Sequence, residues 1–290
     1  MMVSRCYEFA GLRLTIRAPE DLMYEREGRL APFRVPGTSG GYEFELERVA
    51  ALPAPEGQWL VICPSCRVYE QDGVRIRYTG AVGATWEKAY LRTVQQGLSH
   101  KVHLLQDQVP GRVGVHTVLG ALNAEHLVVR SGGVILHAAC VVHEGRAILF
   151  TAPSGTGKST QAELWRCHRG GRIINGDRVA IRLEAGVSVA CGIPFAGSSE
   201  YCENITVPLG AIVYLGQAPE TSIEQLTGFR AFRAVWEGCG VNTWDRQDLE
   251  MATALVQSVL ETVPVYRLYC TPDESAVVAL ERALYGQEGL

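Results

Sequence analysis

The chain has 290 residues, of which 47% are hydrophobic and 20% charged, with a formal net charge of −4; this is the composition of an ordinary soluble globular protein with one large or two modest domains. A weakly acidic balance argues against nucleic acid or an anionic membrane as a partner. No run approaches the roughly 18 apolar residues of a membrane helix, and the N-terminus lacks an apolar block followed by a cleavage site, so we expect a cytoplasmic protein.

The first region, residues 1–110, is predicted to be β-rich. Alternating apolar, branched and aromatic residues indicate strands at 11–18, 42–50, 59–70 and 74–81. Asp72-Gly73 lies between the last two runs and predicts a tight hairpin. No catalytic residue types cluster here, so we expect this region to contribute recognition and not chemistry.

Two pairs of potential metal ligands fall in this region, and both are interpreted as structural. Cys63 and Cys66 form "CPSC" within a strand pattern. A zinc site would need a second such pair, and a redox dithiol would need a helix N-terminus. A metal or redox role is therefore the weaker alternative. His100 and His103 are expected at the surface. The nine cysteines, an odd number, favour a reducing compartment over a disulfide framework.

The second region, residues 111–290, is predicted to be mixed α/β. Helical spacing over 112–130 is followed by a hairpin of residues 133–142 and 147–151, and a helix at 159–168 is followed by a second hairpin within 172–192. Val179, Ile181 and Leu183 are expected on one face of that hairpin. The remaining predicted elements are strands at 211–215 and 264–270 and helices at 225–238, 247–261 and 273–284. Hairpins on both sides of the first helix predict a mixed sheet and not a purely parallel one.

The sequence "APSGTGKST", residues 152–160, is close to the phosphate-loop pattern G-x-x-x-x-G-K-[ST], with Ala152 in place of the first glycine. Small residues let backbone N–H groups turn toward phosphate oxygens at a helix N-terminus. Lys158 would contact the β- and γ-phosphates, and the Ser159 hydroxyl would ligate Mg²⁺. The predicted nucleotide-binding residues are Ser154, Gly155, Thr156, Gly157, Lys158, Ser159 and Thr160.

The alternative is a glycine-rich turn that carries a solvent-exposed lysine. Lysine is rare in this chain and occurs only at positions 88, 101 and 158. A lysine directly after Gly157 is therefore poorly explained by chance, and we favour a functional phosphate site. Ala152 is acceptable if its φ is negative, because the first glycine serves conformation and not contact.

The segments "LHAACVVHEGRAILFTAPSGTGKSTQAELW" and "GGRIINGDRVAI" resemble the catalytic domain of the HPr kinase/phosphorylase family, over about residues 131–195. The resemblance implies the nucleotide-binding fold of phosphoenolpyruvate carboxykinases, that is, an α/β phosphate-loop domain with a mixed sheet after the β-rich region. It also implies an ATP- and Mg²⁺-dependent kinase acting on a hydroxyl, and relatives that form homo-oligomers. His137 matches the family's active-site histidine, and Asp177 matches the second of its paired aspartates. Gly176 replaces the first, and Glu200 or Glu203 could substitute for a missing acidic metal ligand.

These observations define the leading hypothesis, a kinase that transfers the γ-phosphoryl group of ATP to a serine of a peptide or protein, or to a small-molecule hydroxyl. Lys158, His137 and Asp177 are the candidate catalytic residues, and Ser159 and Asp177 are the candidate metal ligands. Either Asp177 holds the metal and His137 is the base, which we favour, or Asp177 is the base. The alternative function is a nucleotide-binding accessory or sensor protein with weak activity. Phosphoenolpyruvate carboxykinase-type metabolism is the third and weakest option.

Overall fold

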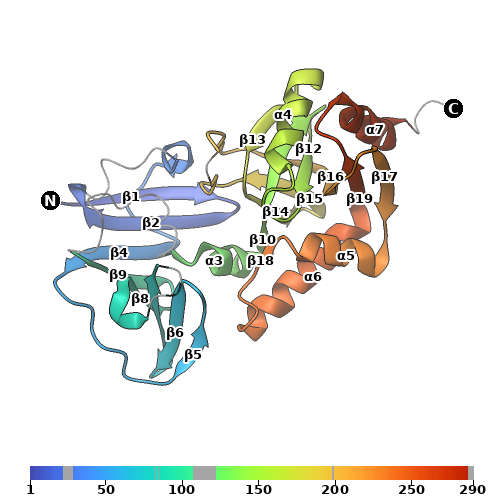
Figure 1. Ribbon diagram of the computed structural model, residues 1–290. Helices are drawn as coiled ribbons and strands as arrows, with labels where there is room; N and C mark the ends of the chain where they lie inside the picture. The colour runs from blue at the N-terminus through green and yellow to red at the C-terminus, as the bar shows by residue number, and fades with distance from the viewer. Residues whose placement is uncertain (22–28, 82, 84, 107–121, 198, 287–290) are drawn as a thin grey trace. The chain divides into compact units, whose positions relative to one another are not determined.

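The computed structural model describes residues 1–21, 29–81, 83, 85–106, 122–197 and 199–286. The chain divides into two compact units, Met1–Leu127 and Val128–Leu290, and each is considered by itself (Figure 1). The boundary expected between residues 110 and 111 lies outside the described residues. So does most of the helix expected at 112–130, of which the structure describes α3 (Ala124–Arg130).

The first unit is built on one nine-stranded mixed sheet in the order β3-β1-β2-β4-β9-β8-β7-β6-β5. Neighbouring strands are antiparallel except for the parallel pairs β2–β4 and β4–β9. Two short 3-10 helices, Ala31–Phe33 and Trp86–Lys88, accompany the sheet. The strands are β1 (Met2–Phe9), β2 (Leu12–Pro19), β3 (Arg34–Val35), β4 (Tyr42–Val49), β5 (Trp59–Ile62), β6 (Cys66–Gln71), β7 (Val74–Gly80), β8 (Ala89–Gln96) and β9 (Ser99–Leu105).

The strands predicted from the sequence are confirmed, with the run 59–70 divided into β5 and β6, and β1, β3, β8 and β9 are additions to them. Asp72 and Gly73 both have positive φ, 52° and 73°, as the tight turn between β6 and β7 requires. Cys63 and Cys66 flank the turn between β5 and β6, where the Cys63 N–H donates to the Cys66 carbonyl at 2.7 Å. This placement agrees with their interpretation as residues beside a strand, and all nine cysteines of the chain are free thiols.

His100 is buried, which corrects the expectation of a surface position. It is 3% exposed, and its ring stacks on Phe44 with centroids 4.4 Å apart. On β9, His100 is paired across the sheet with Phe44 of β4, so the sheet pairing buries a side chain that the local pattern "HKVH" leaves ambiguous. His103 is partly buried, and its Nε2 lies 3.0 Å from Glu47 Oε1.

The burial of His100 predicts that acid destabilises the first unit. Burial, with a smaller contribution from His126, lowers its pKa from 6.5 to about 4. The unfolded chain therefore binds this proton at a higher pH than the folded chain, so the stabilisation is complete above pH 6.5 and is lost as the pH falls toward 4. The loss can reach about 3 kcal/mol.

We expect the free energy of unfolding of His100→Phe to fall less steeply than that of wild type as the pH is lowered from 6.5 to 4. Phenylalanine keeps the ring stacking on Phe44 and cannot bind the proton. Urea unfolding across this pH range measures the difference. His168→Phe, at an exposed histidine, is the matched control. An acid slope that is the same in His100→Phe and wild type would contradict the assignment.

The second unit contains a mixed sheet in the order β13-β11-β12-β16-β15-β14-β10-β18, with β19 also paired to β16 and β17 to β19. Strands β12, β16 and β19 run parallel to one another. The strands are β10 (Gly133–Leu136), β11 (Ala138–His143), β12 (Arg146–Thr151), β13 (Arg172–Asn175), β14 (Val179–Glu184), β15 (Val187–Gly192), β16 (Thr206–Gln217), β17 (Ser222–Leu226), β18 (Cys239–Gly240) and β19 (Val265–Cys270). The mixed sheet predicted for this region is confirmed.

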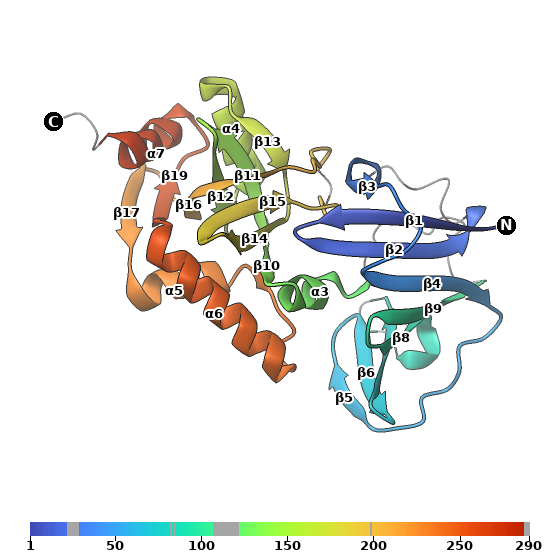
Figure 2. The ribbon, with the colours of Figure 1, turned by 180° about the vertical axis from the view of Figure 1, so that it is seen from behind.

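Helices cover both faces of this sheet (Figures 1 and 2). Side chains alternate across a strand, so Ile148 and Phe150 of β12 pack with α4 and α7, whereas Ala147 and Leu149 lie in the core cluster that contains α5 and α6. The helices are α4 (Lys158–Arg169), α5 (Gly228–Trp236), α6 (Arg246–Thr262) and α7 (Glu274–Tyr285). In the described part of the chain, no helix is long and apolar enough to cross a membrane.

Three sequence expectations are corrected in this unit. His137 was expected within a hairpin strand, but it lies between β10 and β11, which pair with different partners. Asp177 was expected on a strand, but it lies in the connection from β13 to β14. The helix predicted at 225–238 starts later, because residues 225 and 226 are the end of β17 and α5 begins at Gly228. Val179, Ile181 and Leu183 alternate along β14 and share one face as expected, with Val179 and Ile181 buried and Leu183 36% exposed. His137 and Asp177 interrupt the strands expected there for the same reason. Each lies between two consecutive strands that pair with different neighbours.

Candidate functional site

The glycine-rich loop connects β12 directly to α4, as expected. Gly155 and Gly157 have φ of 81° and 113°, and Gly157 caps the helix without a side chain. A Cβ on Gly155 would meet nothing within 4 Å, so its left-handed backbone, and not lack of space, favours glycine there. Ala152 does not have a positive φ, so alanine is accommodated at the first position. The first-turn N–H groups of a helix lack intrahelical partners and favour an anion.

Lys158 is the first residue of α4 and is buried, with 8% exposure. Its Nζ donates to the carbonyl of Ala152 at 3.0 Å and to that of Pro153 at 3.3 Å. Burial lowers its pKa, and the nearby Asp177 carboxylate opposes this shift. The first turn of α4 contains no acidic residue, so the positive charge of Lys158 and the positive end of the helix dipole together favour an anion at the loop. The structure therefore excludes the solvent-exposed lysine of the alternative interpretation.

His137 and Asp177, which are 40 residues apart, form a pair at the same end of the sheet. His137 Nε2 lies 3.0 Å from Asp177 Oδ1. Backbone contacts hold the histidine in place, since its N–H donates to the Gly238 carbonyl at 2.8 Å and its carbonyl accepts from the Thr151 hydroxyl at 3.0 Å. The pKa of Asp177 is lowered, chiefly by its hydrogen bond with His137, so the aspartate is stabilised as a carboxylate.

Asn175 shapes the turn that presents Asp177. It is fully buried, and its amide nitrogen donates to the carbonyls of Ile193 and Phe195 at 2.9 and 3.0 Å. Its Oδ1 accepts from the backbone N–H groups of Asp177 and Arg178, both at 3.0 Å. The asparagine is thus engaged by backbone groups and acts in positioning. Arg178 is the nearest guanidinium to the carboxylate, with Nε 3.6 Å from Asp177 Oδ2.

Gly176 stands where the resembled family has its first aspartate, and the structure has no room for a side chain there. A Cβ on Gly176 would lie 2.1 Å from Ser199 Oγ and 2.5 Å from Ser199 Cβ. A Cβ on Gly197 would similarly lie 2.7 Å from Asp177 Cγ. The segment that contains Gly197 and Ser199 is therefore packed against the turn, and an acid at position 176 would require this segment to move.

A cavity of about 370 Å³ adjoins the loop and the turn. Ser159 reaches it from α4, and the Ser159 hydroxyl lies 3.4 Å from the Gly176 carbonyl. Glu200 lines this cavity together with Asp177, whereas Glu203 forms an ion pair with Arg172. Of the two glutamates considered as substitute ligands, only Glu200 borders the cavity. The lining residues are Ser159, Ala162, Glu163, Ile173, Gly176, Asp177, Ser199, Glu200 and Tyr201.

Sequence reasoning missed Glu163 and Tyr201 as cavity residues, whereas Ser199 was expected in a substrate loop and does line this cavity. Glu163 follows Ser159 by four positions and so lies on the same helix face, a signal that could have identified it. Ser199 and Tyr201 come from an irregular segment, and no local pattern places them near residue 177. Ser159 and Asp177, by contrast, line this cavity together.

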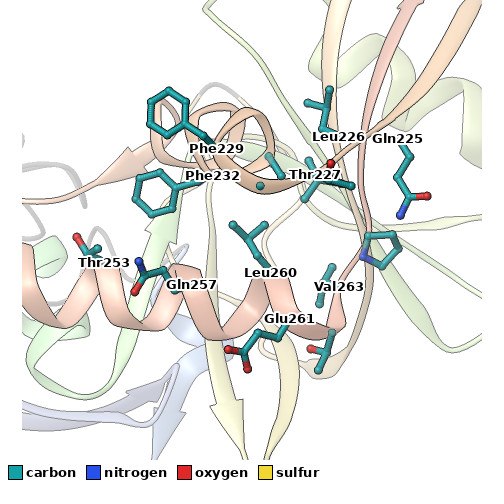
Figure 3. A pocket seen from close by; sticks show the side chains of 15 residues that line it. Gln225, Leu226, Thr227, Phe229, Phe232, Thr253, Gln257, Leu260, Glu261 and Val263 are labelled. Carbon is teal, nitrogen blue, oxygen red and sulfur yellow. The ribbon is translucent and has the colours of Figure 1, made fainter.

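A larger cavity of about 870 Å³ lies between α5, α6 and the ends of β17 and β19 (Figure 3). Phe229 and Phe232 border it from α5, and Leu260 and Glu261 border it from α6. Glu261 is the one charged side chain among its lining residues, and no residue of the glycine-rich loop reaches it. Its greater size therefore does not make it the place for phosphate chemistry, because Ser159 and Asp177 line the smaller cavity.

Comparisons with known proteins do not show a family for this chain. No model of a known protein family matches the chain, and no curated protein matches its sequence. Among solved structures, the chain is similar to the Hpr(Ser) kinase/phosphatase from Coxiella burnetii, with 10% sequence identity and a TM-score of 0.34. The match covers 53% of this chain and 99% of the other. A similarity this low establishes neither a family nor an activity.

Proposed function

We propose that the chain is a phosphotransferase that binds ATP on the glycine-rich loop and transfers the γ-phosphoryl group to a hydroxyl acceptor. The observation that carries the proposal is that Ser159 and Asp177 line one cavity. Ser159 follows Lys158 at the start of α4, and Asp177 Oδ1 lies 3.0 Å from His137 Nε2. The α/β sheet places both at the ends of strands, as in other phosphate-binding folds with a loop between strand and helix.

The residues present fit a nucleotide with Mg²⁺. The loop offers backbone N–H groups and a lysine for the phosphates, and Ser159 and Asp177 offer the hard oxygen ligands that Mg²⁺ prefers. Mg²⁺, when bound, supplies charge neutralisation on the phosphates. His137 can take the proton of the acceptor hydroxyl, because a neutral imidazole suits a base near neutrality. Asp177, held as a carboxylate, orients His137 or the metal.

The acceptor is proposed as a serine of a peptide or protein or a small-molecule hydroxyl. The β-rich residues 1–110 are proposed to recognise it, since the candidate chemical groups all lie in the second unit. We also propose that the second unit has the nucleotide-binding fold of phosphoenolpyruvate carboxykinases.

A nucleotide-binding accessory protein is the second candidate, and one observation favours it. Gly176 removes one carboxylate from the pair, and the packing of Ser199 against Gly176 closes that position to any side chain. A single carboxylate must then serve where the resembled family uses two. Such a protein would bind ATP without efficient transfer.

Isothermal titration calorimetry with ATP and Mg²⁺ tests the shared element of both candidates. We expect a Kd within roughly the micromolar to millimolar range in which enzymes bind substrates, and slow release of ADP that an acceptor accelerates. Binding without any ADP release from a range of acceptors would favour the accessory protein. A chain that shows no binding at millimolar nucleotide would contradict both.

A further inference from the structure

A second cavity, of about 550 Å³, lies on the other side of the glycine-rich loop. It is formed where β16 and β19 end, at Gln217 and Cys270. Both strands run parallel to the sheet member β12 that leads into the loop. In open α/β sheets, ligands bind in the crevice beyond the carboxyl ends of parallel strands. The position of this cavity is therefore that of a ligand site continuous with the loop.

The two cavities divide consecutive residues of α4 between them. Ser159 lines the cavity that contains Asp177, whereas Thr160 lines the second cavity with the loop residues Gly155 and Gly157. A phosphate chain held by the loop must then have one end at each cavity. Because Asp177, which contacts His137, lines the first cavity, the transferred phosphoryl group belongs there. The rest of the nucleotide extends toward Thr160.

The chemistry of the second cavity suits an uncharged heterocycle. Leu215, Ala218 and Pro272 provide apolar surface, and Gln161 and Gln217 provide amides. None of its lining residues is an acid, a lysine, an arginine or a histidine, so it does not attract a further charged group. Its volume is within the range of roughly 300–1,000 Å³ that small-molecule sites occupy, with apolar walls and a few polar groups.

Gln161 provides an independent indication of a ligand. It is 2% exposed, and its Nε2 donates to Cys270 Sγ at 3.2 Å. Its Oε1 is buried and has no hydrogen-bond partner among the described residues. A buried acceptor without a partner is destabilising, and an N–H group of a bound heterocycle would supply the donor. Gln217 can also hydrogen-bond to a bound heterocycle, because its Nε2 donates a long hydrogen bond, of 3.4 Å, to the Thr156 carbonyl.

We propose that this second cavity binds the base and ribose of the nucleotide, with Gln161 and Gln217 hydrogen-bonded to the edge of the base. The inference rests on the proposed function and adds the direction in which the nucleotide lies: base beside Thr160 and Ala218, γ-phosphate beside Ser159 and Asp177. ATP should then bind more tightly than inorganic tripolyphosphate, which can occupy only the loop.

The test compares the binding of Mg²⁺-ATP and Mg²⁺-tripolyphosphate to Ala218→Phe and to wild type by calorimetry. Ala218 is partly exposed at the strand end, so a larger side chain can enter the cavity without entering the core. We expect ATP affinity to fall about tenfold or more and tripolyphosphate affinity to stay unchanged. Glu220→Phe, at an exposed position outside the cavity lining, is the matched control. Gln161→Leu, which removes the amide, should weaken ATP selectively as well.

Three results would overturn the inference while leaving the proposed function in place. They are unchanged ATP affinity in folded Ala218→Phe, equal weakening of both ligands, and wild-type affinity for tripolyphosphate as high as that for ATP. A wild-type chain that binds neither ligand would contradict the proposed function itself, and the base site with it.

Discussion

Lys158→Ala is expected to reduce the affinity for Mg²⁺-ATP about a hundredfold. Lys158 is the cation at the start of α4, and its charge-assisted hydrogen bonds to phosphate would be worth roughly 3 kcal/mol. In the structure the ammonium group is held by the Ala152 and Pro153 carbonyls. It can exchange these carbonyls for phosphate oxygens while staying over the loop. Calorimetry with wild type and variant measures the difference.

Lys101→Ala is the matched control, because it removes the same charge at an exposed position in the first unit. The melting temperature should be recorded for both variants, since Lys158 is buried and its two hydrogen bonds are lost with it. If folded Lys158→Ala binds ATP as wild type does, the loop is a structural turn and the phosphate site must be abandoned.

Mutations of His137 and Asp177 should have different effects, because Asp177 is expected to hold the metal and His137 to act as the base. If Asp177 holds the metal, Asp177→Asn keeps the shape of the side chain and removes the charge, so the Mg²⁺ concentration needed for half-maximal turnover should rise by about tenfold or more. His137→Gln should leave this concentration unchanged and lower the rate at saturating Mg²⁺ by about a hundredfold. Titration of turnover with Mg²⁺ distinguishes the two effects.

The reverse pattern would make Asp177 the base and leave His137 in a supporting position. Ser188→Ala, outside the lining of both loop cavities, is a suitable control for nonspecific loss of activity. Wild-type turnover in both Asp177→Asn and His137→Gln would remove the pair from the mechanism. The lowered pKa of Asp177 keeps its carboxylate ionised at neutral pH, so the Asp177→Asn effect should not depend on pH in that range.

Elements whose cause is local were predictable from the sequence. The turn at Asp72-Gly73 and the left-handed glycines of the loop follow from backbone conformations that few residues adopt. The helix from Lys158 ends at Gly170, with φ of 66°, and a glycine after a helical run signals such an end. For the same reason the loop, its lysine and its serine were identified with the correct strand before and helix after.

Expectations failed where long-range pairing decides the outcome. The apolar run 133–142 reads as one strand, but His137 interrupts it because β10 pairs with β14 while β11 pairs with β12 and β13. The local pattern around His100 is compatible with either face of a strand, and pairing with Phe44 decides that it is buried. The helix predicted at 225–238 begins too early, because residues 225 and 226 belong to β17, whose strand partner β19 lies some 40 positions further along the chain.

The sequence by itself determined the conformation of the glycine-rich loop, the lysine and hydroxyl it carries, and the strands and helices around it, because backbone sterics and hydrophobic periodicity act over a few residues. Only the tertiary structure decided that His137 and Asp177 are in contact, that Ser199 closes the space beside Gly176, and that separate cavities border Ser159 and Thr160. These arrangements depend on which strands become neighbours, and that choice is made by the packing of side chains that are distant in the sequence.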